Sequence, residues 1–554
     1  MKITGAQILI QELMHHNVNE VFGYPGGTVL NIYDELYNNR EHIKHYISAH
    51  EQGATHAADA YARVTGKTGI VIATSGPGST NLVTGIATAF LDSVPLIAIT
   101  GNVATELIGR DSFQEVDIVG ITMPITKHNY IVKKVEDLQE TIREAFYIAN
   151  AGRPGPVLID IPKNVQQGIT EYDKDKKFDI KLGKAKKPYD ITSALDLLRN
   201  SKKPFIYSGG GVVIANASKE LLRLANLIDA PVGTSLMGLS SIPFDNDKAL
   251  GMAGMHGRYA ASKALAECDL LIAIGTRFSD RATGNKKMFI KNCKVLQIDI
   301  DNAEIDKNIP TNIHVIGDIK EVLNRICDFL PQQNNNEWLA HIKEMKESAN
   351  NNMEMSKNKL NPRMVIETVS DAMPGNAVIA TDVGQHQMWT AQYYKFREPR
   401  TFITSGGLGT MGYGMGASIG ACIGSGKKKT VLFTSDGSFH MNLNEVATAV
   451  SNNLPIIIMM LDNNALGMVR QWQTMFYGKR YSETSLDRKT NYVKLIEAFG
   501  AKGYEVTNEE ELKAALKDAK TLSGPCLIHC PIDHNENVFP MIPPNGTIAD
   551  IIIR

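Results

Sequence analysis

The feature that most restricts the fold of this chain is a pair of apolar runs at residues 431–434 and 455–461. Neither run alternates with polar residues, and each is as long as one strand, which predicts two parallel strands buried on both faces of a sheet. The segment 442–451 between them has the length and composition of a helix. Because a strand–helix–strand unit has a right-handed crossover, the carboxyl ends of both strands are expected at the same edge of one sheet.

Polar residues follow both runs at that edge, which is where ligands bind in open α/β sheets. Asp436 comes after the first run, in Ser435-Asp436-Gly437-Ser438, and Asn463 comes after the second. A carboxylate and an amide oxygen suit Mg²⁺, which keeps its other positions for water and phosphate oxygens. Gly437 lets a phosphate approach the backbone, and the helix that follows offers free N–H groups. The pattern predicts a magnesium and phosphate site, and the alternative is two unrelated surface turns.

The rest of the chain repeats this pattern of apolar strands alternating with helices, which predicts an α/β protein with three doubly wound parallel-sheet domains. Two polar stretches rich in Lys or Asn divide it, at residues 171–188 and 332–361. Both are predicted linkers, and the second has a helical patch at 338–346. The expected domains are residues 1–170, 189–331 and 362–554.

Composition narrows the class of function. The net charge of −1 gives no reason to expect a nucleic acid or an acidic membrane as partner, and no apolar run reaches the length of about 18 residues that a membrane span needs. The chain enters a helical pattern at once, so we expect no signal or transit segment. The six cysteines are scattered, and Cys526 and Cys530 have no second pair. A zinc site is therefore not expected, and a reducing cytoplasm is the expected location.

Asp436 and Asn463, with their flanking residues, resemble the diphosphate and magnesium anchor of thiamine-diphosphate (ThDP) enzymes. Two positions depart from the usual motif, because Ser435 replaces a first glycine and Asp462 a first asparagine. Two further motifs precede the anchor in the order shown by ThDP-dependent decarboxylases and carboligases, and the resemblance covers essentially the whole chain. They are His50-Glu51-Gln52-Gly53-Ala54 and Thr74-Ser75-Gly76-Pro77-Gly78-Ser79-Thr80-Asn81.

Glu51 opens a predicted helix, a position where a glutamate commonly does no more than stabilise the helix dipole. The resemblance implies a catalytic carboxyl instead. Glu51 would hydrogen-bond a ring nitrogen of the aminopyrimidine and shuttle its proton, which assists formation of the carbanion on the thiazolium ring. Because Glu51 lies in the first domain and the anchor in the third, one cofactor must be clamped between two domains, within one chain or across two.

More specific motifs resemble the acetohydroxyacid synthase family, the biosynthetic acetolactate synthases. The most discriminating is Arg-Phe-x-Asp-Arg at residues 277–281, because the catabolic acetolactate synthases, which do not use FAD, are not expected to carry it. This resemblance implies a pyrimidine-binding first domain, an FAD-binding central domain and a diphosphate-binding third domain. The remaining motifs of the set lie at residues 23–27, 111–117, 127–128, 160–163, 385–389 and 467–472.

The resemblance carries cofactor residues over position by position. Asp436, Asn463 and the backbone carbonyl of Ala465 would bind Mg²⁺. Met411 would hold ThDP in a bent conformation, a role that suits a bulky flexible apolar side chain, and a core methionine is the alternative. No Gly-x-Gly-x-x-Gly element opens the central domain, so FAD follows from the resemblance alone. The other residues implied to bind ThDP are Glu51, Pro77, Asn81, Gln385, His386, Gly409, Gly437 and Ser438, and those implied to bind FAD are Arg153, His256, Gly257, Arg277, Asp299 and Asp318.

Substrate residues are implied in the same way. Arg281 would read the carboxylate of the second 2-keto acid with its guanidinium fork, and Trp472 would form an apolar wall that prefers an ethyl to a methyl group. The alternatives are a surface salt bridge for Arg281 and core packing for Trp472. Ser279 and Met123 depart from the residues usual in the family, which bears on substrate preference and not on the reaction. The implied substrate-entrance residues are Phe113, Gln114, Lys163 and Met468, and the implied catalytic set is Glu51, Gln114 and Lys163.

The implied reaction is decarboxylation of pyruvate on ThDP and transfer of the two-carbon unit to a second 2-keto acid. Pyruvate as acceptor gives 2-acetolactate and 2-ketobutyrate gives 2-aceto-2-hydroxybutyrate, the first common step of branched-chain amino-acid synthesis. No net redox occurs, so FAD would be largely structural. The alternatives are a pyruvate oxidase or another ThDP-dependent 2-keto acid decarboxylase or carboligase, and, from another class, a non-catalytic cofactor-binding scaffold. The family also implies a homodimer or homotetramer and a separate regulatory small subunit.

Overall fold

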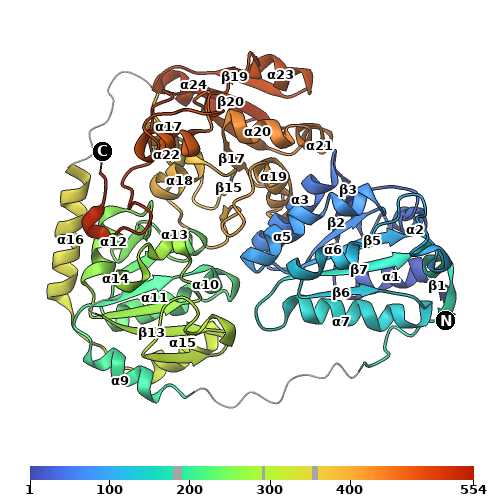
Figure 1. Ribbon diagram of the computed structural model, residues 1–554, viewed down its shortest axis with the longest axis horizontal. Coiled ribbons are helices and arrows are strands. Elements are labelled where there is room, and N and C mark those ends of the chain that lie inside the picture. The colour runs from blue at the N-terminus through green and yellow to red at the C-terminus, as the bar shows by residue number, and fades with distance from the viewer. Residues whose placement is uncertain (179–189, 290–292, 352–359, 554) are drawn as a thin grey trace.

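The computed structural model describes residues 1–178, 190–289, 293–351 and 360–553. They fold into three domains, each built on a six-stranded sheet (Figure 1). Neighbouring strands within these three sheets are parallel throughout, so the predicted fold class is confirmed. Part of each predicted linker, 179–188 in the first and 352–359 in the second, lies outside the described residues.

The sheet of the first domain is covered by helices on both faces because its strands are apolar on both faces. Along β4, Ile70 and Ile72 join one hydrophobic core, and Val71 and Ala73 join the other. The strands in spatial order are β3 (Lys44–Ile47), β2 (Glu20–Tyr24), β4 (Gly69–Ala73), β5 (Leu96–Asn102), β7 (Pro156–Pro162) and β6 (His128–Ile131). The first face carries α1 (Gly5–His15), α2 (Leu30–Asn38) and α7 (Leu138–Asn150), and the second carries α3 (Glu51–Thr65) and α5 (Val83–Asp92).

The central domain repeats this arrangement. The helical patch expected at 338–346 is part of a longer helix, α16 (Asn336–Asn351). Trp338 in α16 is buried, and its indole N–H donates to the carbonyl of Pro204 at 3.0 Å, which fixes the helix against the sheet. The strands in spatial order are β11 (Ala249–Met252), β10 (Val232–Thr234), β9 (Pro204–Ser208), β12 (Leu270–Ile274), β13 (Lys294–Asp299) and β14 (Ile313–Ile316). The helices are α9 (Thr192–Asn200), α11 (Ser218–Leu227) and α15 (Ile319–Phe329) on one face, with α12 (Tyr259–Glu267) and α16 on the other.

The third domain contains the two apolar runs as β17 and β18, which are parallel neighbours as predicted. One helix was expected between them, but the structure has two, α20 (Asp436–Asn442) and α21 (Glu445–Ser451). The first begins at Asp436 itself, and its one buried large apolar residue, Phe439, anchors it in the core. The strands in order are β16 (Phe402–Ile403), β15 (Val378–Thr381), β17 (Thr430–Thr434), β18 (Ile456–Asp462), β20 (Cys526–Pro531) and β19 (Lys502–Glu505). Other helices are α17 (Pro362–Ala372), α18 (Gln385–Tyr393), α19 (Tyr413–Gly424), α22 (Gly467–Phe476) and α24 (Glu509–Ala519).

Helices α3 and α19, from the first and third domains, lie side by side at the centre of the molecule (Figure 1). A Cβ atom on Gly420 would lie 1.8 Å from the carbonyl oxygen of Ala57, and one on Gly416 would lie 2.6 Å from that of Gly53. These oxygens belong to the backbone of α3 and cannot move aside, so only glycine fits at either position. As a result, one hydrophobic core runs through both domains.

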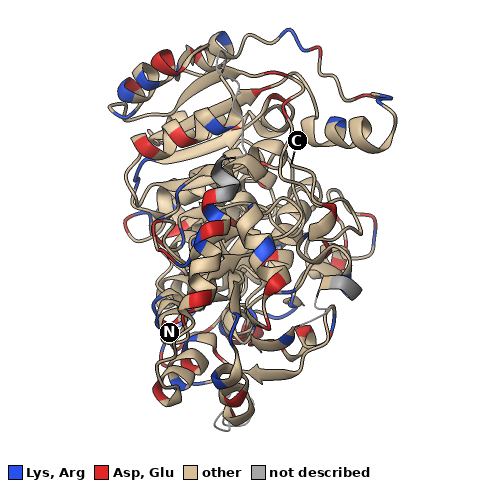
Figure 2. Cartoon of the chain, turned by 90° about the vertical axis from the view of Figure 1, so that its left-hand side faces the viewer, with Lys and Arg blue, Asp and Glu red and all other residues tan. Residues whose placement is uncertain are grey.

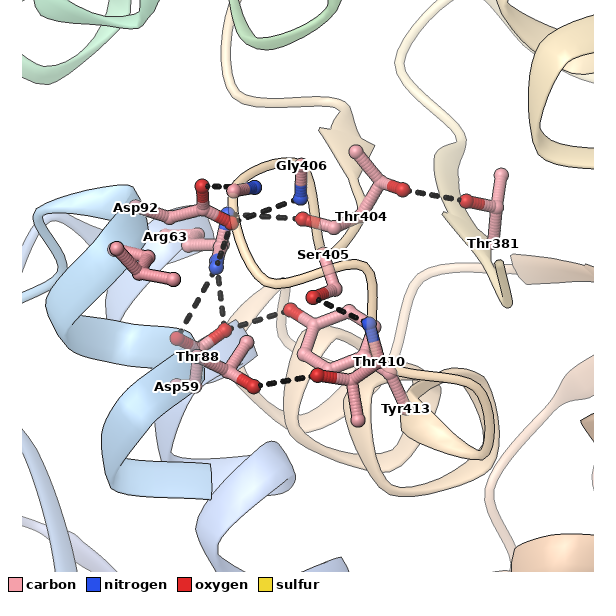
Figure 3. A network of polar contacts seen from close by, with 12 residues as sticks. Asp59, Arg63, Thr88, Asp92, Thr381, Thr404, Ser405, Gly406, Thr410 and Tyr413 are labelled. Carbon is pink, nitrogen blue, oxygen red and sulfur yellow. Dashed lines mark hydrogen bonds and ion pairs between the residues drawn. The ribbon is translucent and has the colours of Figure 1, made fainter. Parts of the chain in front are cut away.

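A buried ionic network joins the last turn of α3 to the third domain (Figure 3). Arg63 donates from Nε to Asp59 at 2.6 Å and from Nη2 to Asp92 at 3.0 Å, and both carboxylates are fully buried. Its Nη1 donates to the carbonyl of Thr404 at 3.0 Å, and the hydroxyl of Tyr413 donates to Asp59 at 2.6 Å. Charges in such a place are tolerated only when they are paired and fully hydrogen-bonded, as they are here.

Asp92 extends this network to a glycine pair and to the central domain. Its two carboxylate oxygens accept the backbone N–H groups of Gly406 at 2.9 Å and Gly407 at 2.8 Å. A Cβ atom on Gly407 would lie 2.9 Å from Asp92 Oδ1, so glycine allows this approach. Arg277 of the central domain lies 3.8 Å from the same carboxylate. All three domains therefore meet at Asp92.

Charges on the surface are intermixed. On the side of the molecule seen in Figure 2, Lys and Arg alternate with Asp and Glu along the same helices. Among the described residues, no helix combines the length and the apolar character needed to cross a membrane.

We predict that Tyr413→Phe destabilises the cofactor-free protein by about 1.5–3 kcal/mol, because it removes a buried hydrogen bond to a charged carboxylate without changing the ring. Urea denaturation of wild type and variant measures the difference. Tyr504→Phe is the matched control, since its hydroxyl donates to Asp518 at 2.8 Å in a place that is partly exposed. The control should cost less than about 0.5 kcal/mol. Equal effects of the two substitutions would contradict the importance assigned to the network.

Candidate active site

Asp436 and Asn463 lie at the carboxyl ends of β17 and β18, at one edge of the sheet. Asp436 is 1% exposed, and neither of its carboxylate oxygens has a hydrogen-bond partner in the protein. Burial, with a smaller contribution from the charge of Asp462, raises the pKa of Asp436 to about 7. A buried carboxylate without a partner is costly, so this side chain is suited to receive a cation.

The amide of Asn463 is oriented by a chain of hydrogen bonds. Its Nδ2 donates to Oε1 of Gln385 at 3.1 Å, and Nε2 of Gln385 donates to Gln471 at 3.1 Å and to the carbonyl of Glu536 at 2.9 Å. The nitrogen of Asn463 is thereby engaged, and its oxygen, which accepts the N–H of Ala465 at 3.3 Å, keeps acceptor capacity. One carboxylate, one amide oxygen and nearby backbone carbonyls form an oxygen donor set that fits Mg²⁺.

The side chain of Met411 lies near Gly437, the residue that follows Asp436. A Cβ atom on Gly437 would lie 3.7 Å from the terminal methyl of Met411, so Met411 reaches toward the start of α20. Gly409 adopts a φ of +72° and lies on the cavity wall beside Met411. The hydroxyl of Ser438 donates to the carbonyl of Val383 at 3.0 Å, which ties α20 to the turn after β15.

His386 is almost fully buried at the start of α18, and its Nε2 has no partner in the protein. Burial lowers the pKa of His386 to about 3, so the imidazole is neutral at every working pH. A neutral imidazole with one free nitrogen can donate to or accept from a polar ligand, but it adds no charge.

A cavity of about 2350 Å³ opens where the three domains meet. It is several times larger than a pocket for one drug-sized molecule, which is about 300–1,000 Å³, and a dinucleotide fits within it. It brings together predicted residues from distant parts of the chain: Arg153, His256, Arg277, Arg281, Asp299, Asp318, Gly409, Met411, Met468 and Trp472.

Several of the residues implied to bind FAD have protein partners. Arg153 donates to Glu304 at 2.7 Å and to Asp301 at 3.3 Å, and it thereby joins the first domain to the central one. The carboxylate of Asp318 caps α15 by accepting the N–H of Glu321 at 3.0 Å. Burial raises the pKa of Asp299 to about 6.

Two further residues of this set differ in their surroundings. Burial lowers the pKa of His256 to about 4, and its Nε2 has no partner in the protein. Gly257 does not line the cavity, and a Cβ atom there would lie 2.7 Å from the backbone of Ala253. It serves a tight turn that brings His256 to the cavity.

The two residues implied to read the second substrate are in contact. The guanidinium of Arg281, on α13 (Asp280–Thr283), lies 5.3 Å from the ring centre of Trp472, on α22. Nη1 of Arg281 also lies 3.6 Å from the sulfur of Met255. Arg281 is well exposed, and its carboxylate neighbour, Asp280, is 3.8 Å away. The cationic head is therefore accessible from the cavity beside a flat apolar surface.

Apart from Arg153, the residues predicted from the first domain lie away from the cavity. The carboxylate of Glu51, the first residue of α3, accepts from Nδ2 of Asn81 at 2.9 Å. Phe113 is 87% exposed, and Gln114 adopts a left-handed φ of +56° against Gly76. Pro77 and Lys163 are exposed at the starts of α4 (Pro77–Thr80) and α8 (Lys163–Gln167). Within the described parts of the chain, the cavity wall includes none of these residues.

Asp382 is a buried site residue that the sequence reasoning missed. It accepts the N–H groups of Gly412 at 2.9 Å and Gly414 at 3.0 Å, and the hydroxyl of Thr434 at 2.8 Å. Through Asp382, these contacts attach the loop that contains Met411 to the end of β17. Asp382 follows the apolar strand β15, just as Asp436 follows β17. The search for polar residues at the ends of apolar strands, which singled out Asp436, could therefore have singled out Asp382.

Comparison with known families agrees with this geometry. Thiamine pyrophosphate enzyme models match the chain three times: the N-terminal TPP binding domain at residues 3–121, the central domain at 191–326 and the C-terminal TPP binding domain at 382–530. The fold and the site define a thiamine-diphosphate-dependent enzyme.

Similar proteins show which group of thiamine-diphosphate enzymes the chain belongs to. The chain is 45% identical to the probable acetolactate synthase large subunit of Methanocaldococcus jannaschii, over 99% of this chain and 95% of the relative. It is 42% identical to the acetolactate synthase large subunit of Buchnera aphidicola subsp. Schizaphis graminum, over 100% and 99%. It is 41% identical to the acetolactate synthase isozyme 2 large subunit of Escherichia coli, over 99% of each. The chain belongs to the family of acetolactate synthase large subunits, and the predicted resemblance is confirmed.

The buried state of His386 has a consequence for stability below neutral pH. Its pKa is about 3 in the folded protein and about 6.5 when unfolded, so the unfolded state binds the extra proton between these values. The contribution is intact above the unfolded pKa and is lost as the pH falls below it. We predict that His386→Gln reduces the loss of stability between pH 7 and pH 5 by roughly 2 kcal/mol.

Denaturant titrations of the cofactor-free protein at the two pH values measure this difference. His341→Gln is the control, because His341 lies on the surface beside Glu267, and it should leave the loss unchanged. An unaltered pH dependence in His386→Gln would show that the imidazole is not held neutral.

Proposed function

We propose that the protein uses ThDP, Mg²⁺ and FAD to convert two molecules of pyruvate into 2-acetolactate, and pyruvate with 2-ketobutyrate into 2-aceto-2-hydroxybutyrate. The observation that carries the proposal is the buried, unpartnered carboxylate of Asp436 beside Asn463, in a chain whose relatives are acetolactate synthase large subunits. Asp436, Asn463 and the carbonyl of Ala465 hold Mg²⁺. The full set of ThDP, FAD and substrate residues is the one predicted above.

When bound, ThDP supplies the carbanion that attacks a 2-keto acid. The protein supplies position and proton transfer. Glu51 holds and moves the proton of the aminopyrimidine, and Asn81 keeps its carboxylate in place. Met411 would pack against the cofactor, and the half-buried Gln114 and the exposed Lys163 would line the approach of the substrate. Apolar side chains such as Met411 and Trp472 would exclude water, which favours transfer of the two-carbon unit to the second keto acid.

Arg281 receives the carboxylate of the second keto acid, because its planar fork offers two parallel donors. Trp472 faces the alkyl end. Their 5.3 Å separation places a charge for one end of a small keto acid beside a wall for the other. Residues of the cavity wall that include Arg277 and Asp299 would hold FAD, and FAD would be largely structural because the reaction has no net redox.

A pyruvate oxidase is the second candidate, since it would pass electrons from the same cofactor pair to an acceptor. Anaerobic incubation of the reconstituted protein with pyruvate alone, and with 2-ketobutyrate added, separates the two. We expect acetolactate and acetohydroxybutyrate without peroxide. Peroxide on admission of oxygen, with little acetolactate, would assign the oxidase.

We further propose that one active site is built from two chains. Within one chain, the carboxylate of Glu51 accepts a hydrogen bond from Asn81 and not from the Asp436 anchor, and among the described residues that line the cavity are neither Glu51 nor Asp436 and Asn463. In a homodimer or homotetramer, Glu51 of one chain would face the Asp436 anchor of its neighbour. The relatives are named large subunits, which supports a small regulatory subunit as a further partner. Six free thiols support a reducing cytoplasm as the location.

This assembly makes a prediction about mixed chains. Glu51→Gln should lose about 10²–10⁴-fold in turnover, and Asp436→Ala should lose Mg²⁺ and ThDP affinity together. When the two inactive variants are dissociated and reassociated in equal amounts, half of the dimers are mixed. Each mixed dimer has one intact site, so about a quarter of wild-type activity should return.

The matched control mixes wild type with the double variant Glu51→Gln/Asp436→Ala, whose mixed dimers have no intact site. If the single variants fail to complement each other while remaining associated in sedimentation, each site belongs to one chain.

The contact between Arg281 and Trp472 predicts acceptor choice. Trp472→Leu should reduce the preference for 2-ketobutyrate over pyruvate by roughly 10-fold or more while acetolactate formation stays substantial, because one methylene in an apolar pocket is worth about 1–3 kcal/mol. Arg281→Lys should slow carboligation with either acceptor, since an ammonium cannot form the two-pronged contact. A competition assay that measures both products decides both points.

The control is Phe476→Leu, an aromatic residue on the same helix whose ring centre is 5.7 Å from that of Trp472 but which does not line the cavity. It should leave the product ratio unchanged. An unchanged ratio in Trp472→Leu would make Trp472 a packing residue.

A further inference from the structure

Glu445 of the third domain is a fully buried carboxylate whose partners lie in the first domain. It is the first residue of α21, which follows α20 of the Asp436 anchor. Oε1 accepts the N–H of His50 at 2.9 Å, and Oε2 accepts the N–H of Ala49 at 3.2 Å. Thr448 of the same helix adds a hydroxyl donor to Oε2 at 2.8 Å. The carboxylate therefore accepts three hydrogen bonds, two of them from the residues just before Glu51.

The first turn of α3 is shaped to receive this carboxylate. A Cβ atom on Gly53 would lie 2.1 Å from Oε1 and 2.4 Å from Cδ of Glu445, so any side chain there would push the carboxylate out. The ring of His50 is used within its own turn, where Nδ1 accepts the N–H of Gln52 at 3.1 Å. The cap of α3 thus has a local part from His50 and a long-range part from Glu445.

These contacts bear on the carboxyl that Glu51 presents. Glu51 is held at its far end by Asn81 and at its backbone by the segment of residues 49–50. Without Glu445, two buried N–H groups would lack acceptors, and the segment would move to find others. A shift of about 1 Å in a group that transfers protons can cost about 10²-fold in rate.

We propose that Glu445 is a positioning residue that fixes the proton-transferring carboxyl of Glu51 from the third domain. The inference rests on the proposed function, because it assumes that Glu51 moves the proton. It predicts a loss in kcat that follows the number of hydrogen bonds removed, with little change in KM for pyruvate.

Three variants of the full-length protein with its cofactors test the proposal. Glu445→Gln keeps the shape of the side chain and one acceptor oxygen, but its NH₂ group would face an N–H or O–H donor, so kcat should fall roughly 10-fold. Glu445→Ala removes both acceptor oxygens, so kcat should fall roughly 100-fold. KM for pyruvate should stay within about threefold in both. Glu509→Gln is the matched control, because Glu509 also begins a helix of the third domain but is partly exposed and pairs with Lys513. It should behave as wild type.

Amide hydrogen exchange of the cofactor-free protein gives a second readout that does not depend on turnover. The amides of Ala49 and His50 should be protected in wild type, less so in Glu445→Gln and least in Glu445→Ala, while peptides of β17 and β18 keep their protection. Wild-type kcat and protection in both variants would overturn the proposal, as would a loss of kcat without a change at residues 49–50. Glu51→Gln is assayed alongside. If it also retains activity, the proposed function itself fails, whereas an inactive Glu51→Gln beside an active Glu445→Ala rejects only the positioning role.

Discussion

The contact between α3 and α19 determines where the catalytic groups can lie. Because residues 416 and 420 are glycines, α19 approaches the backbone of α3 so closely that no side chain would fit between them. The third domain therefore sets the angle and register of α3. Close packing of this kind leaves almost no freedom to slide or rotate. Glu51 is the first residue of α3 and Arg63 lies near its end. The packing of α3 against α19 therefore sets the positions of both residues.

Each end of α3 is then fixed by a carboxylate that is not its sequence neighbour. At the first turn Glu445 accepts the backbone N–H groups, and at the last turn Asp92 accepts a hydrogen bond from Arg63. Asp92 also accepts the N–H groups of Gly406 and Gly407, which begin the loop that leads to Met411 (Figure 3). The ionic network adds little net stability by itself, since desolvation offsets much of its attraction. Its effect is to allow one arrangement of the loop and the helix, because any other would leave buried charges unpaired.

The sequence predicted the parts of this structure that are local. Continuous apolar runs identified the strands of the parallel sheets, and the ends of two of those strands placed Asp436 and Asn463 at one edge of a sheet. The role predicted for Glu51 came from the family resemblance, because the start of a helix by itself predicts only that a glutamate stabilises the helix dipole. The helix at 436–442 was missed because its only buried large apolar residue is Phe439, which packs into a core shared with α19. Asp92 and Glu445 were missed because the backbone N–H groups that they bind in another domain lie hundreds of positions away, and no periodicity connects them.

The hydrogen bonding of the buried carboxylates separates scaffold from site. Asp59, Asp92 and Glu445 are buried carboxylates, and the backbone or side chains around them supply donors to their oxygens. Among the described buried carboxylates, Asp436 alone has both oxygens without a partner, and unpaired imidazole nitrogens occur nearby at His386 and at the cavity residue His256. Every other buried carboxylate of the described residues has at least one donor, although Oε2 of Glu304 has none, so the fold offers no structural reason to leave both oxygens of Asp436 unpaired. A bound cation and a polar cofactor would supply the partners that the Asp436 carboxylate lacks. The unpartnered carboxylate therefore marks the site.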